Sequence, residues 1–530
     1  MADSPPSKEA AVDTETKPET QQTYVPSHTD IESVDHGIIV NAAPLARKLK
    51  SRHMQMIAIG GAIGAGLFVS SGSALSTGGP ASLVLGYMIV GSMLLCTVQA
   101  LGELAVLFPV NGAFFTYVVR FVDPAYGFAV GWDYAIGWLT VLPFELTAAG
   151  ITIRFWREDL NIGIWIGVFL IFGIRGYGEV EFVLSTIKVL GCVGFVILGV
   201  VIDCGGTGPQ GYIGAKYWHD PGAFNNGFKG FCSVFVVAAF AFGGTELAGL
   251  AAAEAVNPKK SIPQATKQVF WRITFFYVVS LFILGLIVPY TNDNLLNSTG
   301  ANSKYSPFVI AIRLAHIQAL PSIFNVIITV SVISVANSCT FGSTRTMQAL
   351  ADAGRPIWGV VIQLAFGLLA FTGESNNEGT VFNWLLALSG LSFFFIWAAI
   401  CLAHIRFRHA WRVQGHVKAE LPFEAMFGVM GSWYGLILNI LCMIATFFVA
   451  LFPLVGSPNA SAFFQSYLAA PIVIALYFGW KLYDRSWGLW ISAENMDIVS
   501  GRRSIELDPN DMPPEKTWRN MPMRMVHALF

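Results

Sequence analysis

The stretch Cys232–Glu254 reads CSVFVVAAFAFGGTELAGLAAAE. It is apolar enough to span a bilayer, yet Gly243, Gly244, Thr245 and Glu246 interrupt it. Each glycine costs about 1 kcal/mol of helix propensity relative to alanine, and a charge at the bilayer centre costs roughly 2.5–3.5 kcal/mol or more. A helix that only had to sit in lipid would contain none of these residues. The stretch therefore predicts a membrane helix that is broken around a functional site.

A second interrupted segment lies near the start of the chain, where Met56–Leu75 reads MIAIGGAIGAGLFVSSGSAL. Two glycine-broken apolar segments, one in each half of a chain, are typical of secondary transporters that bind substrate at the bilayer midplane. The pattern predicts movement of a small polar solute across a membrane. For the glycines of this N-terminal segment, close helix packing through small residues remains the alternative explanation.

The composition agrees with a membrane protein that crosses the bilayer many times. Of 530 residues, 54% are hydrophobic and 12% are charged, whereas soluble domains carry about 25% charged residues. A net charge of −1 argues against a nucleic-acid partner, which needs a basic patch. The sequence contains no HExxH, paired CxxC or phosphate-loop motif, and no nucleophile–base constellation. We therefore expect no metal, no cofactor and no enzymatic activity.

Twelve apolar segments have spanning or near-spanning length. They cover 54–75, 81–108, 125–155, 162–174, 183–202, 230–253, 270–289, 323–342, 357–371, 382–404, 432–455 and 462–480. The preceding residues 1–44 are polar and acidic, which predicts a disordered tail, and residues 481–530 form a second tail. The transmembrane domain is expected over 45–480, with helices 1–5 at 54–202, helices 6–10 at 230–404 and helices 11–12 at 432–480.

The distribution of positive charge predicts the orientation. With the N-terminus inside, sixteen Lys and Arg residues fall in cytoplasmic loops and six in external loops, as the positive-inside rule requires. Both termini are then cytoplasmic. The sequon at Asn297 is external, and the one at Asn459 lies close to the membrane.

The two broken segments open the first and sixth helices, so the first ten helices divide into five plus five. A repeat unit with an odd number of helices must be inverted in the membrane, which brings the two breaks together at the centre. The predicted fold class is an all-α membrane protein with a 5+5 inverted repeat plus two extra helices.

Four stretches carry a resemblance to a known family. They are GGAIGAGLF at Gly60–Phe68, FGGTELAGLAAAEAVNPKKSIPQATKQVFWRI at Phe242–Ile273, GYGEVEFVLSTIKVLGCVGFVILG at Gly176–Gly199 and SCTFGSTRTMQALA at Ser338–Ala351. They resemble the amino acid–polyamine–organocation superfamily, and within it the fungal amino-acid permeases of the yeast amino-acid transporter family. The similarity covers all but the N-terminal tail.

The resemblance implies a leucine-transporter-like fold and broad-specificity uptake of amino acids, driven by protons across a fungal plasma membrane. The vacuolar membrane is the alternative location. The implied partners are amino acids, protons and the lipid bilayer, and ubiquitin-ligase machinery acting through the cytoplasmic tails. The chain departs from the family pattern in a short segment 160–174 and a short connection at 352–356.

Amino acids are zwitterions, so their site needs donors for a carboxylate and acceptors for an ammonium. Backbone N–H groups of the first break and the dipole of the half-helix after it suit the carboxylate; these residues are Ala62, Ile63, Gly64, Ala65 and Gly66. Carbonyls freed in the second break at Phe240, Ala241 and Gly243 suit the ammonium. Aromatic candidates for walls and gates are Trp138, Phe242, Phe393, Phe394 and Trp397, for which ordinary packing is the alternative.

Ionisable groups inside apolar segments are further candidates. Glu246 in the second break is expected to bind the substrate amine through a neighbour or to steady the unwound backbone. Thr245 beside it is a substrate-binding candidate, and changing Thr245 or Phe240 is expected to alter the ranking among substrates. Lys188 resembles the lysine that replaces a sodium ion in proton-coupled relatives, with a snorkelling side chain as the alternative. Glu145 is expected to pair across the bundle, and Glu103 to order a loop or gate.

Two other functions on the same fold stay open at this level. An amino-acid channel or exchanger would use the same glycine breaks, and a channel would not show saturable uptake. A transport-inactive sensor would usually carry a longer cytoplasmic extension than the tails present here.

Overall fold

The computed structural model of the chain describes residues 61, 63–156, 163–165, 177–207, 211–255, 257–296, 306–351, 357–374, 378–454 and 456–502. Several predictions fall outside these ranges: the N-terminal tail 1–44, Ala62, most of the segment 162–174, the sequon at Asn297 and the connection 352–356. Within the described ranges the regular structure is helical, with no β-strand.

The longer α-helices are α2 (Ser71–Leu107), α4 (Pro124–Arg154), α6 (Tyr177–Asp203), α7 (Gly227–Phe242), α9 (Pro258–Trp271), α13 (Leu320–Ala351), α14 (Ile357–Gly367), α15 (Glu378–Val413), α16 (Gly428–Leu451) and α18 (Ala469–Asp484). Shorter helices are α3 (Ala113–Phe121), α8 (Leu247–Leu250), α10 (Ser280–Ile287), α11 (Asp293–Leu296), α12 (Pro307–Leu314) and α17 (Ala460–Tyr467). Turns of 3₁₀ or π type are η1 (Gly66–Ser70), η2 (Trp218–Gly222), η3 (Ala251–Glu254), η4 (Arg272–Val279), η6 (Leu368–Glu374) and η7 (Lys418–Glu420).

Seven helical runs among the described residues are long and apolar enough to cross a bilayer, and the pair α17–α18, bent by 71°, makes eight. The longest run, Gly66–Leu107, is not one straight helix, because Gly79 has φ +80° and Pro80 follows it. A left-handed φ suits glycine, and proline removes a helical hydrogen-bond donor. The two residues therefore separate the end of the first predicted segment from the start of the second.

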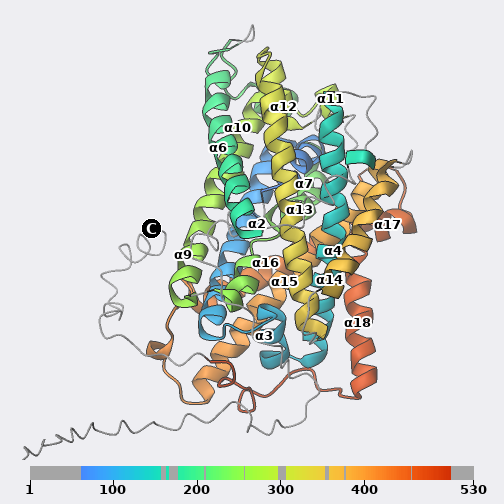
Figure 1. Cartoon of the computed structure of the whole chain (residues 1–530). Helices are drawn as coiled ribbons and strands as arrows, with labels where there is room; N and C mark the ends of the chain where they lie inside the picture. The colour runs from blue at the N-terminus through green and yellow to red at the C-terminus, as the bar shows by residue number, and fades with distance from the viewer. Residues whose placement is uncertain are drawn as a thin grey trace, which may run out of the picture. The chain divides into compact units, whose positions relative to one another are not determined.

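The helices pack so that segments distant in the sequence lie side by side (Figure 1). α13 runs along α4 and also contacts α6, while α2 runs along α7. α15 contacts α4, α7 and α16. The first and sixth predicted segments are thereby surrounded by helices from both halves of the chain.

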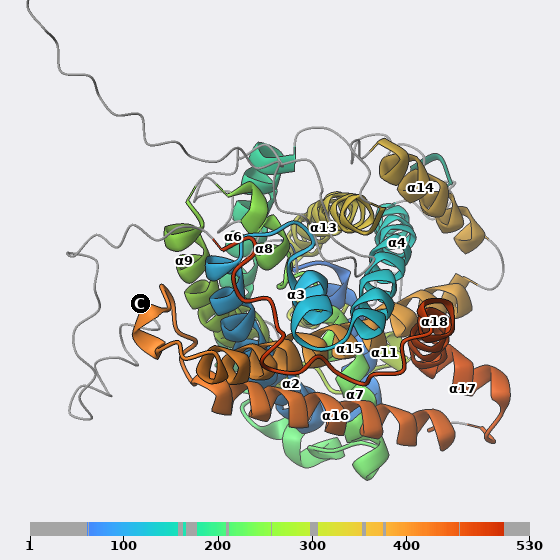
Figure 2. The same ribbon diagram turned by 90° about the horizontal axis from the view of Figure 1, so that it is seen from below.

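The pattern of buried and exposed residues on α16 shows that its outer face suits lipid rather than water. Its buried positions are mostly small or polar, among them Gly435, Asn439 and Thr446, whereas Ile437, Leu441 and its other exposed positions are mostly apolar. This is the reverse of a helix on a water-soluble protein. Small residues at helix contacts and apolar residues outside are typical of helices in lipid. Figure 2 shows α16 lying along the edge of the bundle beside α2 and α7.

Two helices extend further than hydropathy predicts. α9 begins at Pro258 rather than at residue 270, and α15 continues to Val413 rather than ending at 404. Pro258 at the first helical position suits a helix start, and polar residues such as Lys259 then follow on the surface. Hydropathy detects only the apolar part of a helix, so these polar ends were missed.

The chain after α18 packs against the same end of the bundle as α3 (Figure 2). The Ile491 N–H donates to the carbonyl of Val122 at 3.0 Å, and Gln414 Nε2 donates to the carbonyl of Met496 at 2.9 Å. Met496 and Ile498 are 3% and 1% exposed. The part of the predicted C-terminal tail up to residue 502 is therefore built into the fold.

Candidate functional site

The first break follows the glycines at the start of the described chain. Ile63 and Ala65 are fully buried, and the first hydrogen bond of the new helix runs from the Phe68 N–H to the Gly64 carbonyl at 3.1 Å. A Cβ atom on Gly64 would lie 2.5 Å from Val335 Cγ2 and 3.2 Å from Glu145 Oε1. The absent side chain therefore leaves room for α13 and for the Glu145 carboxylate.

The second break separates α7 from α8. α7 ends at Phe242, Gly243 takes an extended ψ of 145°, and Gly244 takes a left-handed φ of +95°. A Cβ on Gly244 would lie 2.7 Å from the carbonyl oxygen of Gly61. The two breaks are thus in contact, as the inverted-repeat argument predicts.

Not all carbonyls of the second break are free. The Tyr277 hydroxyl donates to the Ala241 carbonyl at 2.8 Å, and the Gly243 N–H donates to the Phe240 carbonyl at 3.1 Å. Among the described residues, no hydrogen bond reaches the Gly243 carbonyl. A carbonyl has two lone pairs, so all three can still accept, but Gly243 offers the least occupied oxygen.

A small cavity lies where the two breaks meet. It is lined by Gly66, Trp138, Val141, Glu145, Phe240, Gly243, Val335 and Phe393. Its volume of about 10 Å³ is close to the space that a single water needs. In this conformation the walls have therefore closed on the site, and an amino acid enters only if wall side chains move.

Glu145 is the one ionisable residue of that lining. Its side chain is 1% exposed, and no hydrogen bond to its Oε2 atom occurs within the described part of the chain. A buried acceptor without a partner is costly. Sequence reasoning expected Glu145 to pair across the bundle. The structure places its carboxylate in the cavity lining beside Gly64, where it also interacts electrostatically with Lys188 on α6.

Glu246 lies in the second break but does not line the cavity. Its Oε1 atom accepts hydrogen bonds from the Gly244 N–H at 3.1 Å and the Tyr134 hydroxyl at 3.2 Å. Its Oε2 atom accepts one from Trp397 Nε1 at 3.4 Å. These contacts suit the second expected role of Glu246, which is to steady the unwound backbone.

Thr245 and Phe242 do not line the cavity either. The Thr245 hydroxyl donates to the Phe242 carbonyl at 2.7 Å and accepts from Arg272 Nη2. The Phe242 ring packs on Tyr277, with ring centres 4.4 Å apart. Arg272 is 1% exposed, although the charge count along the sequence placed it in a cytoplasmic loop. The sequence pattern around Arg272 gave no indication that its guanidinium contacts Thr245.

The aromatic candidates divide between wall and support. Trp138 and Phe393 line the cavity and pack edge to face at 6.1 Å. Trp397, which does not line the cavity, stacks on Phe393 with ring centres 5.8 Å apart, and Phe394 packs on Trp397. The wall residues Val141 and Val335 were not predicted, because an apolar residue in an apolar helix carries no distinguishing pattern.

Lys188 is fully buried, with its Nζ atom 3.8 Å from Glu181 Oε1. A snorkelling lysine would reach the surface with its ammonium group, and this one does not. Glu181, which sequence reasoning missed, is also fully buried.

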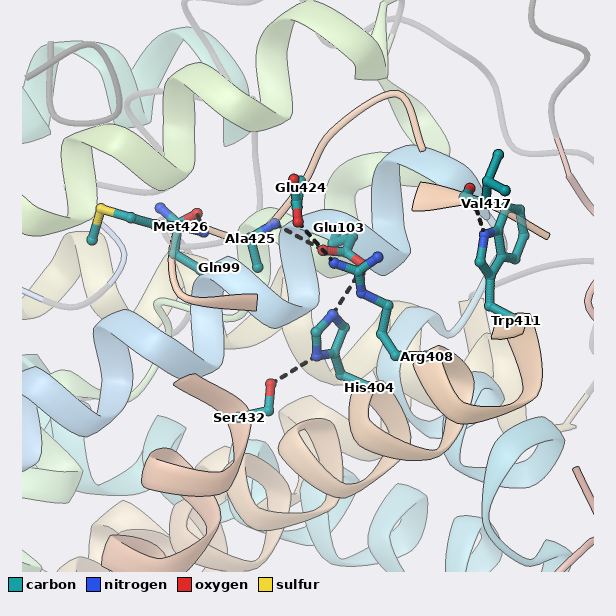
Figure 3. A network of polar contacts seen from close by, with 10 residues as sticks. All are labelled: Gln99, Glu103, His404, Arg408, Trp411, Val417, Glu424, Ala425, Met426 and Ser432. Carbon is teal, nitrogen blue, oxygen red and sulfur yellow. Dashed lines mark hydrogen bonds and ion pairs between the residues drawn. The ribbon is translucent and has the colours of Figure 1, made fainter. Parts of the chain in front are cut away.

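Glu103 lies away from the cavity, in a polar cluster at the end of α2 (Figure 3). Its Oε1 atom pairs with His404 Nε2 at 3.1 Å and Arg408 Nε at 2.9 Å, and its Oε2 atom accepts the Ala425 N–H at 2.8 Å. Arg408 also reaches Glu424 at 3.3 Å. Glu103 is thus held against the segment before α16.

Known proteins similar to the chain include membrane transporters. The profile of the amino acid permease family matches residues 53–493. The general amino-acid permease GAP1 of Saccharomyces cerevisiae is 50% identical over 509 residues, covering 91% of this chain and 84% of that protein. The general amino-acid permease GAP2 of Candida albicans is 51% identical over 505 residues, covering 91% and 85%.

A solved structure of the Eremococcus coleocola manganese transporter aligns with a TM-score of 0.52 at 14% identity, covering 82% of this chain and 94% of that one. At this identity the likeness shows the fold alone. The predicted all-α, leucine-transporter-like fold class is confirmed, as is the resemblance to fungal amino-acid permeases. The chain belongs to the amino acid permease family.

Proposed function

We propose that this amino-acid permease is a secondary active transporter that takes up amino acids together with protons. It does so across the plasma membrane, with both termini in the cytoplasm. The observation that carries the proposal is the meeting of two glycine breaks at a buried cavity that contains Glu145. The relatives GAP1 and GAP2 are named general amino-acid permeases, which supports broad specificity.

The cavity offers complementary groups for the two charges of an amino acid. The backbone around Gly64 and Gly66, with the helix that starts there, presents N–H groups to the carboxylate. The Glu145 carboxylate and the Gly243 carbonyl present acceptors to the ammonium. Every α-amino acid carries both charged groups, so the side-chain wall, including Phe240 and Phe393, sets the preference among substrates.

Proton coupling is supported by Lys188, a buried base that can exist in two protonation states. We expect radiolabelled amino acids to accumulate in permease-deficient yeast that expresses the chain. Accumulation should collapse when a protonophore is added and should be unchanged when sodium is replaced by potassium. Strict sodium dependence would contradict proton coupling.

The same experiment separates the rival functions. A channel would give uptake that does not saturate with substrate concentration, and a sensor would give no uptake of any amino acid in the panel. Saturable, concentrative uptake supports the permease.

A further inference from the structure

Glu181 is a buried carboxylate that the substrate site does not use. It lies on α6 seven residues before Lys188, so the two side chains share one face of the helix. Both side chains are fully buried, and Lys188 Nζ is 3.8 Å from Glu181 Oε1. A buried ammonium needs a nearby opposite charge, and Glu181 supplies one from the same helix.

The Glu181 carboxylate is fixed in place by two hydroxyl groups. Ser185 donates to Oε1 at 2.9 Å and Ser334, from α13, donates to Oε2 at 2.6 Å. Ser334 neighbours Val335, which lines the substrate cavity. The α13 residue that binds Glu181 is therefore next in sequence to a residue of the cavity wall.

The titratable groups around Lys188 come from three helices. They are Glu181 on α6 itself and Glu145 on α4, with the thiols of Cys192 on α6 and Cys339 on α13 nearby. With both carboxylates and the ammonium ionised, these groups carry a net charge of −1. One additional proton makes them neutral, and neutrality is favoured in a water-excluded interior.

We propose that Glu181 is a proton-accepting residue of the transport cycle and forms one proton-binding unit with Lys188 and Glu145. The Lys188 ammonium donates its proton to a Glu181 oxygen, which leaves a neutral amine and a carboxylic acid without changing the net charge. The neutral amine then accepts the next proton from the side of Glu145 and the cavity. This proposal rests on the proton-coupled function proposed above.

The test uses Glu181→Gln in the full chain, reconstituted in liposomes with an inward gradient of one pH unit. In a one-to-one symport such a gradient sustains roughly tenfold accumulation, because both correspond to about 1.4 kcal/mol. The wild type should reach about that level and Glu181→Gln should stay near onefold. Exchange of external for internal amino acid should persist in the variant, because the substrate contacts are unchanged.

Ser334→Ala is the matched control, since it removes one donor to Glu181 and keeps the carboxylate; it should still accumulate substrate. Full accumulation by a correctly inserted Glu181→Gln would overturn the proposal. If Glu181→Gln does not insert, the Ser185→Ala/Ser334→Ala double variant takes its place as the test. In this double variant the pH of half-maximal uptake should differ from that of the wild type, and an unchanged pH profile would overturn the proposal.

The two proposals fail in different ways. If wild-type uptake ignores the proton gradient, proton coupling itself is wrong. If the wild type follows the gradient and Glu181→Gln does too, only the role of Glu181 is wrong.

Discussion

At Gly66 there is no space for a side chain. A Cβ atom there would lie 2.6 Å from the Cα atom of Ala241, which belongs to the backbone of α7 and cannot turn aside. Any larger residue must push the two broken helices apart. The backbone proposed to bind the substrate carboxylate and the cavity are then both displaced, whichever amino acid is offered.

Gly66→Val should therefore eliminate uptake of every amino acid tested, while the protein still reaches the membrane. The measurement is a radiolabelled uptake panel with surface localisation of the variant. Gly194→Val is the control, because nothing lies within 4 Å of a Cβ at that position of α6. Normal uptake by a correctly localised Gly66→Val would mean that the glycines serve helix packing alone.

Phe240 and Thr245 are both in the second break but face different surroundings. Phe240 lines the cavity, whereas the Thr245 hydroxyl joins the Phe242 carbonyl to Arg272. Phe240→Ala should change the ranking of substrates by removing part of the wall. Thr245→Val should lower uptake of all substrates together and keep the ranking, because it loosens the break.

Competition assays with a set of unlabelled amino acids measure both outcomes. Thr186→Val serves as the control, since Thr186 makes a similar hydrogen bond to Phe182 on the exposed face of α6. A changed ranking in Thr245→Val would place that side chain in contact with substrate.

The sequence singled out candidate site residues where a residue type conflicted with its surroundings. Glycines and Glu246 in an apolar run signal a break because they carry a cost there. Glu181 and Arg272 gave no such signal, and Ser334 and Thr245, which contact them, lie on other elements of the fold. Their roles depend on distances between α6, α13 and the second break, which a single sequence does not contain.

At the scale of elements, the Glu103 cluster holds α2, α15 and the segment before α16 together (Figure 3). Glu103→Gln would keep an acceptor for the Ala425 N–H but leave Arg408 without its closest buried counter-charge. Breaking a buried ion pair on one side typically costs about 3–5 kcal/mol. The variant should unfold at a clearly lower temperature in detergent.

Glu420→Gln provides the comparison for this thermal measurement. Glu420 pairs with His416 at 2.7 Å but is 37% exposed, and exposed pairs contribute little. Its substitution should leave the unfolding temperature nearly unchanged. Equal unfolding temperatures for the two variants would show that the Glu103 cluster is not a structural tie.

Helix existence was easier to predict than helix ends. The apolar runs predicted most elements, but α9 and α15 extend into polar sequence that hydropathy ignores. Residues 485–502 were expected to be part of a tail, yet Met496 and Ile498 are buried against the bundle. Such packing depends on contacts with the ends of α3 and α15, such as the Ile491–Val122 and Gln414–Met496 hydrogen bonds, which exist only in the folded protein.

At the scale of the whole molecule, the helix arrangement supports the proposal that one chain binds a zwitterion and a proton together. The two breaks meet at the cavity, and Glu145 links that cavity to the buried Lys188–Glu181 pair. In the proposed mechanism, the substrate and proton sites share the Glu145 carboxylate. Occupation of one site changes the electrostatic environment of the other, which is what coupling requires.

The most direct test is to measure proton entry and amino-acid entry in the same preparation. The purified chain is placed in sodium-free liposomes that contain a pH-sensitive dye, and an amino acid is added outside. The account predicts that the interior acidifies as the labelled amino acid enters, and that both signals disappear in Lys188→Ala. Amino-acid entry without acidification by the wild-type chain would contradict it.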